Sequence, residues 1–505
     1  MNRLDRLVGW FAPERGLARA RARIQAEALA RFYDAARPGR ATHGWPAPQT
    51  SAASETYAAL PWLRARSRDL ERNNPHIAKM NASLVDNLVG DGIMPKANTG
   101  DEQRDAYIDR EIAAPFFEAL DADGMHDLVG LQRLGARIMI SGGEAVLRRR
   151  RRFSSDALPL PLQLQLLEGD FIDNRKNAGT QAGGRVVQGV EFDTRGRRRG
   201  YWMFRDHPSD AFLAAAPGSV ETGFLPAGDV ALCFEAQRAG QVRGVPWSTP
   251  AMVRARLLDD YEDAERQRKR MESSTPIIVH SNQSGGEASE GRDPSLYPTL
   301  VDADGRLAEE VMPGLIAYLR GDTTVEVIKP ADAMGYAPYK RSELQSIAAG
   351  GRVPYEFVAG DLTGTNYSSI QAGRLDYKAM IFGVRRGTFI PQFCQPIWRW
   401  MIDGAIVAGR LPEGTPYGVT WHPPEWQEVD AEKAENAWLQ AIRSGRKTLF
   451  QAIASTGRDP VEHLGEIAKA MRLLDAAGII LDSDARRVDR RGVFQNPDRD
   501  EQAGA

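Results

Sequence analysis

Residues 248–273, STPAMVRARLLDDYEDAERQRKRMES, constrain the fold most, because they predict a long helix too charged to be buried. Ser248 or Thr249 can cap it, and Pro250 fits its first turn. Acidic residues precede basic ones, which suits the helix dipole and allows i,i+4 pairs such as Glu262 with Arg266. We expect the helix to face water, a second copy of the chain, or a channel. The acids and bases in this order include Asp259, Asp260, Glu262, Asp263, Arg266, Arg268, Lys269 and Arg270.

Hydrophobic patterns elsewhere predict a mixture of helices and strands, an α+β chain. Asn74 and Pro75 divide two helices within residues 62–89, with Asn74 as cap and Pro75 at the first helical position. The other predicted elements are a helix carrying Leu128, Leu131, Leu134 and Ile138, a strand at 161–171, a hairpin at 186–204 turning at 194–196, two short strands within 312–330, a helix beginning at 339, helices over 366–410 broken at Pro391 and Pro396, and a helical domain from 430 to 474.

Composition excludes several classes of protein. A chain of 505 residues is long enough for about two to four domains, and its 42% hydrophobic residues supply real cores. Lys plus Arg number 65 against 67 for Asp plus Glu, whereas a protein that grips nucleic acid over its whole surface is clearly basic. Cys233 and Cys394 are far apart and form no CxxC motif, which argues against a zinc ribbon or a disulfide framework and suits a reducing cytoplasm. We find neither a signal peptide nor an apolar run near the roughly 18 residues of a membrane span.

Residues 355–374, YEFVAGDLTGTNYSSIQAGR, contain a run of glycines and hydroxylated residues that could hold a phosphate or present a nucleophile. The run lacks the lysine of a GxxxxGK phosphate loop, and GxSxG and HExxH do not occur in the chain. We therefore predict no catalytic, cofactor-binding or metal-binding residues. Two alternatives stay open: a hydrolase using Ser368 or Ser369, and a soluble DNA-binding module. The second would use the five arginines of 148–152 and a basic helix at 16–33.

Six segments, in order, resemble the lambda family of tailed-phage portal proteins. They are RARSRDLERNNPHIAKMNASLVDNLVGDGIMP (64–95), LEGDFID (167–173), GVEFDTRGRRRGYW (189–202), LPAGDVALCFEAQRAGQVRGVPW (225–247), MPGLIAYLRGD (312–322) and IAAGGRVPYEFVAGDLTGTNYSSIQAGR (347–374). The resemblance covers most of residues 30–410, and both ends of the chain depart from it.

The resemblance implies a homo-oligomeric ring, typically of twelve subunits, at one capsid vertex of a phage virion assembled in the bacterial host cytoplasm. Double-stranded DNA is packaged and ejected through such a ring. It contacts the major capsid or scaffold protein, docks the terminase large subunit, and then binds head-completion and tail connector proteins. It is not an enzyme, uses no cofactor and has no membrane partner.

The same resemblance divides the chain into regions and places a channel. The implied regions are an N-terminal arm and linker (1–59), an α/β wing (60–247), a first stem helix (248–273), a small α/β clip (274–337), a second stem helix (338–354), a channel-proximal loop with a helix returning to the wing (355–427), a helical crown (428–475) and a disordered tail (476–505). The candidate channel- or DNA-proximal residues are Thr363, Gly364, Thr365, Asn366, Tyr367 and Ser368 in the loop, and Arg266, Lys269 and Arg270 on the first stem helix.

Overall fold

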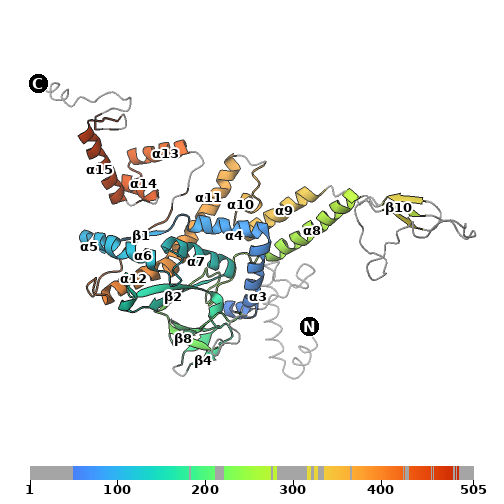
Figure 1. The fold of residues 1–505 in the computed structure, drawn as a ribbon, viewed down its shortest axis with the longest axis horizontal. Helices are drawn as coiled ribbons and strands as arrows, with labels where there is room; N and C mark the ends of the chain where they lie inside the picture. Colours follow the sequence, from blue (N-terminus) through green and yellow to red (C-terminus); the bar gives the residue numbers. More distant parts are fainter. Residues whose placement is uncertain are drawn as a thin grey trace, which may run out of the picture. The chain divides into compact units, whose positions relative to one another are not determined.

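A computed structural model gives the fold (Figure 1). The chain divides into two units, Met1–Ser51 and Ala52–Ala505, and the helices and strands below belong to the second. The predicted helix at 16–33, residues 281–295 of the predicted insertion and residues 488–505 of the predicted tail lie outside the described residues. The structure describes residues 49–180, 183–210, 221–274, 277–280, 316–319, 324–327, 335–363, 367–424, 426, 431–456, 458, 460–481, 484 and 486–487.

Helices α3 (Ala52–Asn73) and α4 (Pro75–Leu88) confirm the predicted helix pair. The Asn74 side chain accepts a hydrogen bond from the Ile77 N–H at 2.9 Å, so it caps α4 as expected. The last residues of the predicted linker are helical, because α3 already begins at Ala52. The helical stripe of α4 is buried through Ile77, Met80, Leu84 and Leu88.

Three antiparallel strands form the central sheet, in the order β3–β2–β9. On one face, Leu147 of β2 and Leu164 of β3 share a hydrophobic core with Leu131 and Met139 of α7. This confirms the predicted helix around residue 131 and the predicted half-buried strand. The bounds are β2 Ala145–Arg151, β3 Leu162–Glu168, β9 Val230–Cys233 and α7 Leu128–Gly142.

The opposite face of the central sheet packs against a second, five-stranded sheet. Val146 and Leu232 share a smaller core with Val190, Tyr201 and Met203. The predicted hairpin at 186–204 is confirmed as β6 and β7, and Gly196 in its turn has a φ of +79°. The bounds are β4 Ala178–Gly179, β5 Arg185–Val187, β6 Val190–Phe192, β7 Arg198–Phe204 and β8 Thr222–Pro226.

Residues 367–407 remain helical throughout, so the predicted breaks at Pro391 and Pro396 are wrong. The reason is a π-helix, η6 (Arg385–Cys394), which contains Pro391 and joins α11 (Tyr367–Val384) to α12 (Gln395–Val407). Pro396 lies in the first turn of α12. Buried aromatic side chains, among them Phe389, Phe393 and Trp398, hold the segment in the main core.

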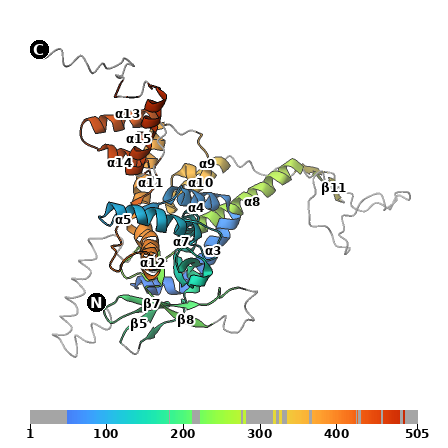
Figure 2. The same cartoon turned by 60° about the vertical axis from the view of Figure 1, so that its left-hand side comes forward.

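Further strands and helices complete the fold. All helices and strands taken together make the described chain α+β, as predicted. The two strands predicted within 312–330 are confirmed as β11 and β12, although β10 lies between them. Figure 2 labels the three helices of the predicted C-terminal helical domain. Strand β1 (Met94–Ala97) pairs with β13 (Val419–His422), and the other strands are β10 Ile277–His280, β11 Ile316–Leu319 and β12 Thr324–Val327. The helices are α5 Glu102–Tyr107, η2 Ile108–Ala113, α6 Ala114–Ala119, η3 Ser154–Asp156, η4 Gly169–Phe171, α13 Ala431–Arg443, α14 Leu449–Ser455 and α15 Pro460–Ala477.

Candidate functional site

The charged segment folds into helix α8 (Met252–Ser274), which packs antiparallel to α9 (Tyr336–Gly350), as Figure 1 shows. The Lys340 ammonium lies 2.7 Å from a carboxylate oxygen of Glu262, and Arg254 lies 3.0 Å from Glu343. The Tyr261 ring contacts the rings of Tyr336 and Tyr339 of α9, with centroid distances of 6.1 and 4.7 Å. Ion pairs and aromatic contacts therefore join the two helices where apolar residues are few.

Helix α8 neutralises much of its own charge. Its sequence contains six basic and six acidic side chains. Arg266 lies 2.9 Å from Asp263 and 3.8 Å from Glu262. The contact with Glu262 is the predicted i,i+4 pair. Arg268 Nη2 donates a hydrogen bond to Glu265 Oε1 at 2.6 Å, and this bond lowers the pKa of the Glu265 carboxyl. Lys269 and Arg270 are exposed near the C-terminal end of the helix.

The candidate loop follows α10 (Tyr355–Ala359), which ends at Gly360 with a φ of +68°. The backbone N–H and the hydroxyl of Thr363 both donate to Asp361 Oδ1, at 2.8 and 2.5 Å, and lower the pKa of the Asp361 carboxyl. The exposed Thr363 hydroxyl thus already has an acceptor inside the loop. Gly364, Thr365 and Asn366 lie outside the described residues, as do the side chains of Tyr367, Ser368 and Ser369.

Helix α9, which leads toward the candidate loop, ends beside the N-terminal end of α8, whereas Arg266, Lys269 and Arg270 lie in the C-terminal half of α8. Gly350, at the end of α9, approaches Ala251 closely, and α10 with its loop follows Gly350. Arg266 is fifteen residues beyond Ala251 along the chain, which corresponds to about 22 Å of helix. In the described part of one chain, no hydrogen bond or ion pair connects Thr363 with Arg266, Lys269 or Arg270.

Four of the five arginines, Arg148–Arg151, form the second half of strand β2, and Arg152 follows the strand. Arg149 lies 2.5 Å from Asp229 and 3.4 Å from Asp403, and its guanidinium stands over the Trp400 ring. Arg151 shares Asp229 at 3.4 Å. Part of the run is therefore neutralised inside the chain, which weakens its interpretation as a DNA-binding patch.

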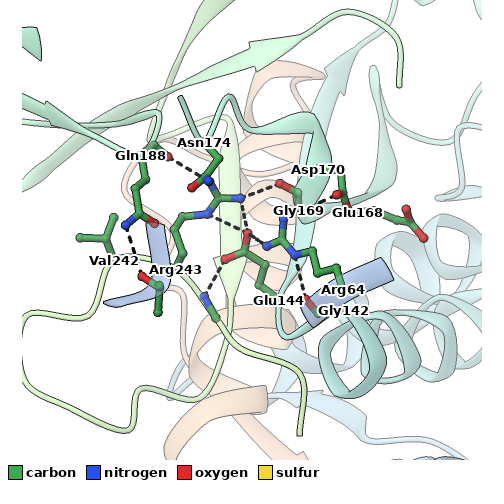
Figure 3. Close-up of polar contacts among 12 residues, drawn as sticks. Arg64, Gly142, Glu144, Glu168, Gly169, Asp170, Asn174, Gln188, Val242 and Arg243 are labelled. Atoms are coloured by element: carbon green, nitrogen blue, oxygen red, sulfur yellow. Dashed lines mark hydrogen bonds and ion pairs between the residues drawn. The ribbon is translucent and has the colours of Figure 1, made fainter. Parts of the chain in front are cut away.

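A buried ionic cluster, formed by Arg64, Glu144 and Arg243, was missed by the sequence analysis (Figure 3). Glu144 Oε1 accepts hydrogen bonds from Arg64 Nη2 at 2.6 Å and Arg243 Nε at 2.8 Å, and Glu144 Oε2 accepts one from the Gly244 N–H at 2.8 Å. Burial alone would raise the pKa of Glu144, but the charges of Arg243 and Arg64 outweigh it and lower the pKa below its usual range.

The cluster joins segments that are distant in sequence. Arg243 also donates to the Gly169 carbonyl at 2.6 Å and the Gln188 carbonyl at 2.9 Å, and Arg64 donates to the Gly142 carbonyl at 3.0 Å. One signal could have revealed it: Arg64 falls on the buried stripe of α3 between Leu60 and Leu70. A charged side chain in that stripe needs a buried partner.

A second group, Glu168, Asp170 and His207, brings potential metal-ligating atoms within 4.8 Å of one another. Arg68 Nη2 already contacts both carboxylates, at 2.9 Å from Glu168 and 2.5 Å from Asp170. A guanidinium therefore occupies the cation position, and this group gives no evidence of a metal site. Within the described residues, no helix is long and apolar enough to cross a membrane.

The described chain is an α+β protein with a charged, largely self-neutralised helix pair, α8–α9. The sequence comparisons identify the class: the model of the family "Phage portal protein, lambda family" matches residues 38–385. The chain belongs to this family of portal proteins, as the six segments indicated.

Individual relatives agree with the family match. The chain is 24% identical over 470 residues to a probable portal protein of Halomonas phage phiHAP-1, covering 89% of this chain and 88% of that protein. It is 22% identical over 469 residues to portal protein B of Escherichia phage lambda, covering 82% and 84%. It is also 22% identical over 521 residues to the portal protein of Escherichia phage N15, covering 92% and 94%.

Solved structures are more distant. A chain from the neck of a native GTA particle, computed with C12 symmetry, has a TM-score of 0.44 at 14% identity, covering 78% of this chain and 94% of that one. A portal protein of the HK97 family from Corynebacterium diphtheriae has a TM-score of 0.31 at 11% identity, covering 66% and 86%. TM-scores this low do not define a shared fold, so the family assignment rests on the sequence matches.

Proposed function

We propose that this portal protein assembles into a closed ring, typically of twelve subunits, at one vertex of a tailed-phage capsid. Double-stranded DNA enters and leaves through this ring, which docks the terminase large subunit during packaging and head-completion or tail proteins afterwards. The observation that carries the proposal is the family match over residues 38–385. In this assignment α8 and α9 are the stem helices, β10–β12 belong to the clip, and α13–α15 form the crown.

The charge distribution of α8 supports a role in DNA transit. Each phosphate that a cation neutralises releases counterions and adds affinity, and a ring repeats every side chain once per subunit. A strongly basic lining would therefore hold DNA in place. The six basic and six acidic side chains of α8, several paired within the helix, give a lining of low net charge along which a duplex can slide.

We assign three basic residues of α8, Arg266, Lys269 and Arg270, either to the channel lining or to contacts with a neighbouring subunit. The double variant K269Q/R270Q removes two exposed cations from each copy without changing the helix propensity appreciably. The matched control is R256Q, which removes one exposed cation of α8 that pairs with Asp260 at 2.9 Å.

The test measures ring assembly by size-exclusion chromatography and DNA packaging and retention in particles. Loss of assembly would assign the two residues to contacts with acids of a neighbouring subunit, and loss of retention in intact rings would assign them to a sparse basic ring. Wild-type assembly, packaging and retention in K269Q/R270Q would contradict both assignments. R256Q should leave all three unchanged.

The loop at 360–368 is the second part of the proposal, as a channel-proximal loop whose hydroxyls make weak, exchangeable contacts. Because the Thr363 hydroxyl donates to Asp361, we assign it to shaping the loop, and we assign contact with DNA or a neighbouring subunit to residues 364–368. Of the alternative functions, the hydrolase rests on Ser368 and Ser369, whose side chains lie outside the described residues, and the DNA-binding module is weakened by the pairing of Arg149 and Arg151 within the chain.

A further inference from the structure

Arg352 has a backbone conformation that its residue type does not favour. It lies in the turn between α9 and α10, and its φ of +58° is in the left-handed region. The turn is closed by hydrogen bonds from Arg352 N to Ala349 O at 3.2 Å and from Val353 N to Ala348 O at 3.0 Å. Such positions after a helix usually carry glycine, because a Cβ is crowded there. The chain therefore carries arginine where glycine would be less strained.

The Arg352 side chain makes two contacts that glycine could not make. Its Nη1 and Nη2 atoms donate to the two carboxylate oxygens of Glu235, at 3.0 and 2.5 Å. Its guanidinium carbon lies 4.8 Å from the ring centroid of the buried Trp247. A planar guanidinium is suited to both contacts at once. The side chain therefore connects the α9–α10 turn to the residues after β9 and to the segment before α8.

The α9–α10 turn packs tightly against helix α4. A Cβ added at Gly351 would lie 2.2 Å from Met80 Sδ of α4. Helix α10 continues along α4, where its Val358 is buried and the Val358 carbonyl lies 3.2 Å from His76 Nδ1. A helix of five residues is too short to be stable by itself, so its direction depends on the turn before it.

We propose that Arg352 is a positioning residue, which fixes the direction of α10 and of the loop that leaves it at Gly360. The importance of this position rests on the proposed function, in which that loop lies beside the DNA channel. A left-handed arginine costs free energy of the same order as one ion pair or one cation–π contact contributes. Loss of the contacts to Glu235 and Trp247 therefore shifts the turn while the rest of the chain stays folded.

Hydrogen exchange measured by mass spectrometry on the intact chain, over peptides covering residues 355–363, tests this role. R352G removes both side-chain contacts but fits the left-handed backbone, and E235Q weakens only the ion pair. The matched control is E343Q, which weakens the Arg254–Glu343 ion pair between α8 and α9. We expect exchange in α10 to accelerate about tenfold in R352G, by a smaller factor in E235Q, and to be unchanged in E343Q.

R352G is the decisive variant, because the two explanations of Arg352 predict opposite results for it. If Arg352 were only a strained residue that ends α9, glycine would relieve the strain and α10 would exchange as in the wild type or more slowly. That result, in a variant with wild-type thermal stability, would overturn the proposal. R352K keeps the charge but loses the planar fork, and we expect an intermediate exchange rate.

The exchange measurement needs no DNA, so it separates this inference from the proposed function. Faster exchange in α10 together with unchanged DNA packaging by the same variant would support the positioning role and contradict the channel role of the loop. Unchanged exchange together with altered packaging would contradict the positioning role.

Discussion

Glu144 and Asp263 both pair with arginine, but their surroundings differ completely. Glu144 is fully buried between Arg64 and Arg243, whereas Asp263 and its partner Arg266 have side chains 65% and 64% exposed on α8. In water the attraction between opposite charges is weak and screened by salt, while a buried charge without its partner is very unfavourable. Arginine–carboxylate pairs therefore hold chain segments together in the buried cluster, whereas on α8 they only reduce the net charge of the surface.

The largest expected effect is the removal of the buried carboxylate. E144A leaves two buried guanidinium groups without their counter-charge, and we expect it to lower the free energy of unfolding by about 3–5 kcal/mol. The matched control D263A removes an exposed partner and should cost less than about 1 kcal/mol. Urea denaturation followed by circular dichroism measures both. Equal losses of unfolding free energy in E144A and D263A would contradict the expected difference between the buried and the exposed ion pairs.

Acid should remove the stabilisation that the buried carboxylates contribute. The pKa values of Glu144 and Asp170 are lowered in the folded chain by neighbouring arginines, against the effect of burial. Their contribution is therefore fully present above the ordinary carboxyl values of 4.5 and 3.8, and it is lost as the pH falls further through the lowered values. Urea midpoints measured between about pH 6 and pH 3 should fall less steeply for E144Q than for the wild type. Parallel curves would show that Glu144 is not the group responsible.

Arg385 gives an intermediate case, a buried cation that backbone carbonyls hold without a carboxylate among the residues the structure describes. Its Nε and Nη2 donate at 2.9 Å to the carbonyls of Leu88 and Asn87 at the end of α4, and burial lowers its pKa to about 10. R385M keeps the apolar volume and leaves these carbonyls without donors, so we expect a loss of about 1–3 kcal/mol. Thermal unfolding of R385M measures this loss, and a value as large as that of E144A would argue against the ranking.

The smallest effect is expected at the surface between α8 and α9. E343Q weakens one exposed ion pair and should lower the free energy of unfolding by less than about 1 kcal/mol. The difference from the wild type should vanish in high salt, because salt screens exposed charges. A loss in E343Q that persists at high salt would show that the pair is not behaving as a surface contact.

Local features of the fold could be read from the sequence. The Asn74 cap, the alternating leucines of β3 and the hairpin at Gly196 each depend on neighbouring residues, so their patterns are visible in a short window. The break expected at Pro391 failed because tertiary packing of Phe389 and Phe393 keeps the π-helix in place. Pattern rules for proline describe α-helices and do not include that context.

The long-range features could not be read in this way. Glu144 and Arg243 are 99 residues apart, and Arg352 meets Glu235 across 117 residues, so neither pairing leaves a periodic signal. For the candidate site, the pairing of acids and bases on α8 was visible from their order, whereas its attachment to α9 through Glu262 and Lys340 was not. Whether residues 364–368 reach the channel stays a prediction.

Electron microscopy of the purified, full-length chain tests the central claim most directly. A portal protein should form closed rings, with a central hole at least as wide as a B-DNA duplex, about 20 Å. DNA binding by these rings should be weak. A monomer that binds double-stranded DNA tightly, with an affinity that falls steeply with salt concentration, would contradict the account and favour a DNA-binding module.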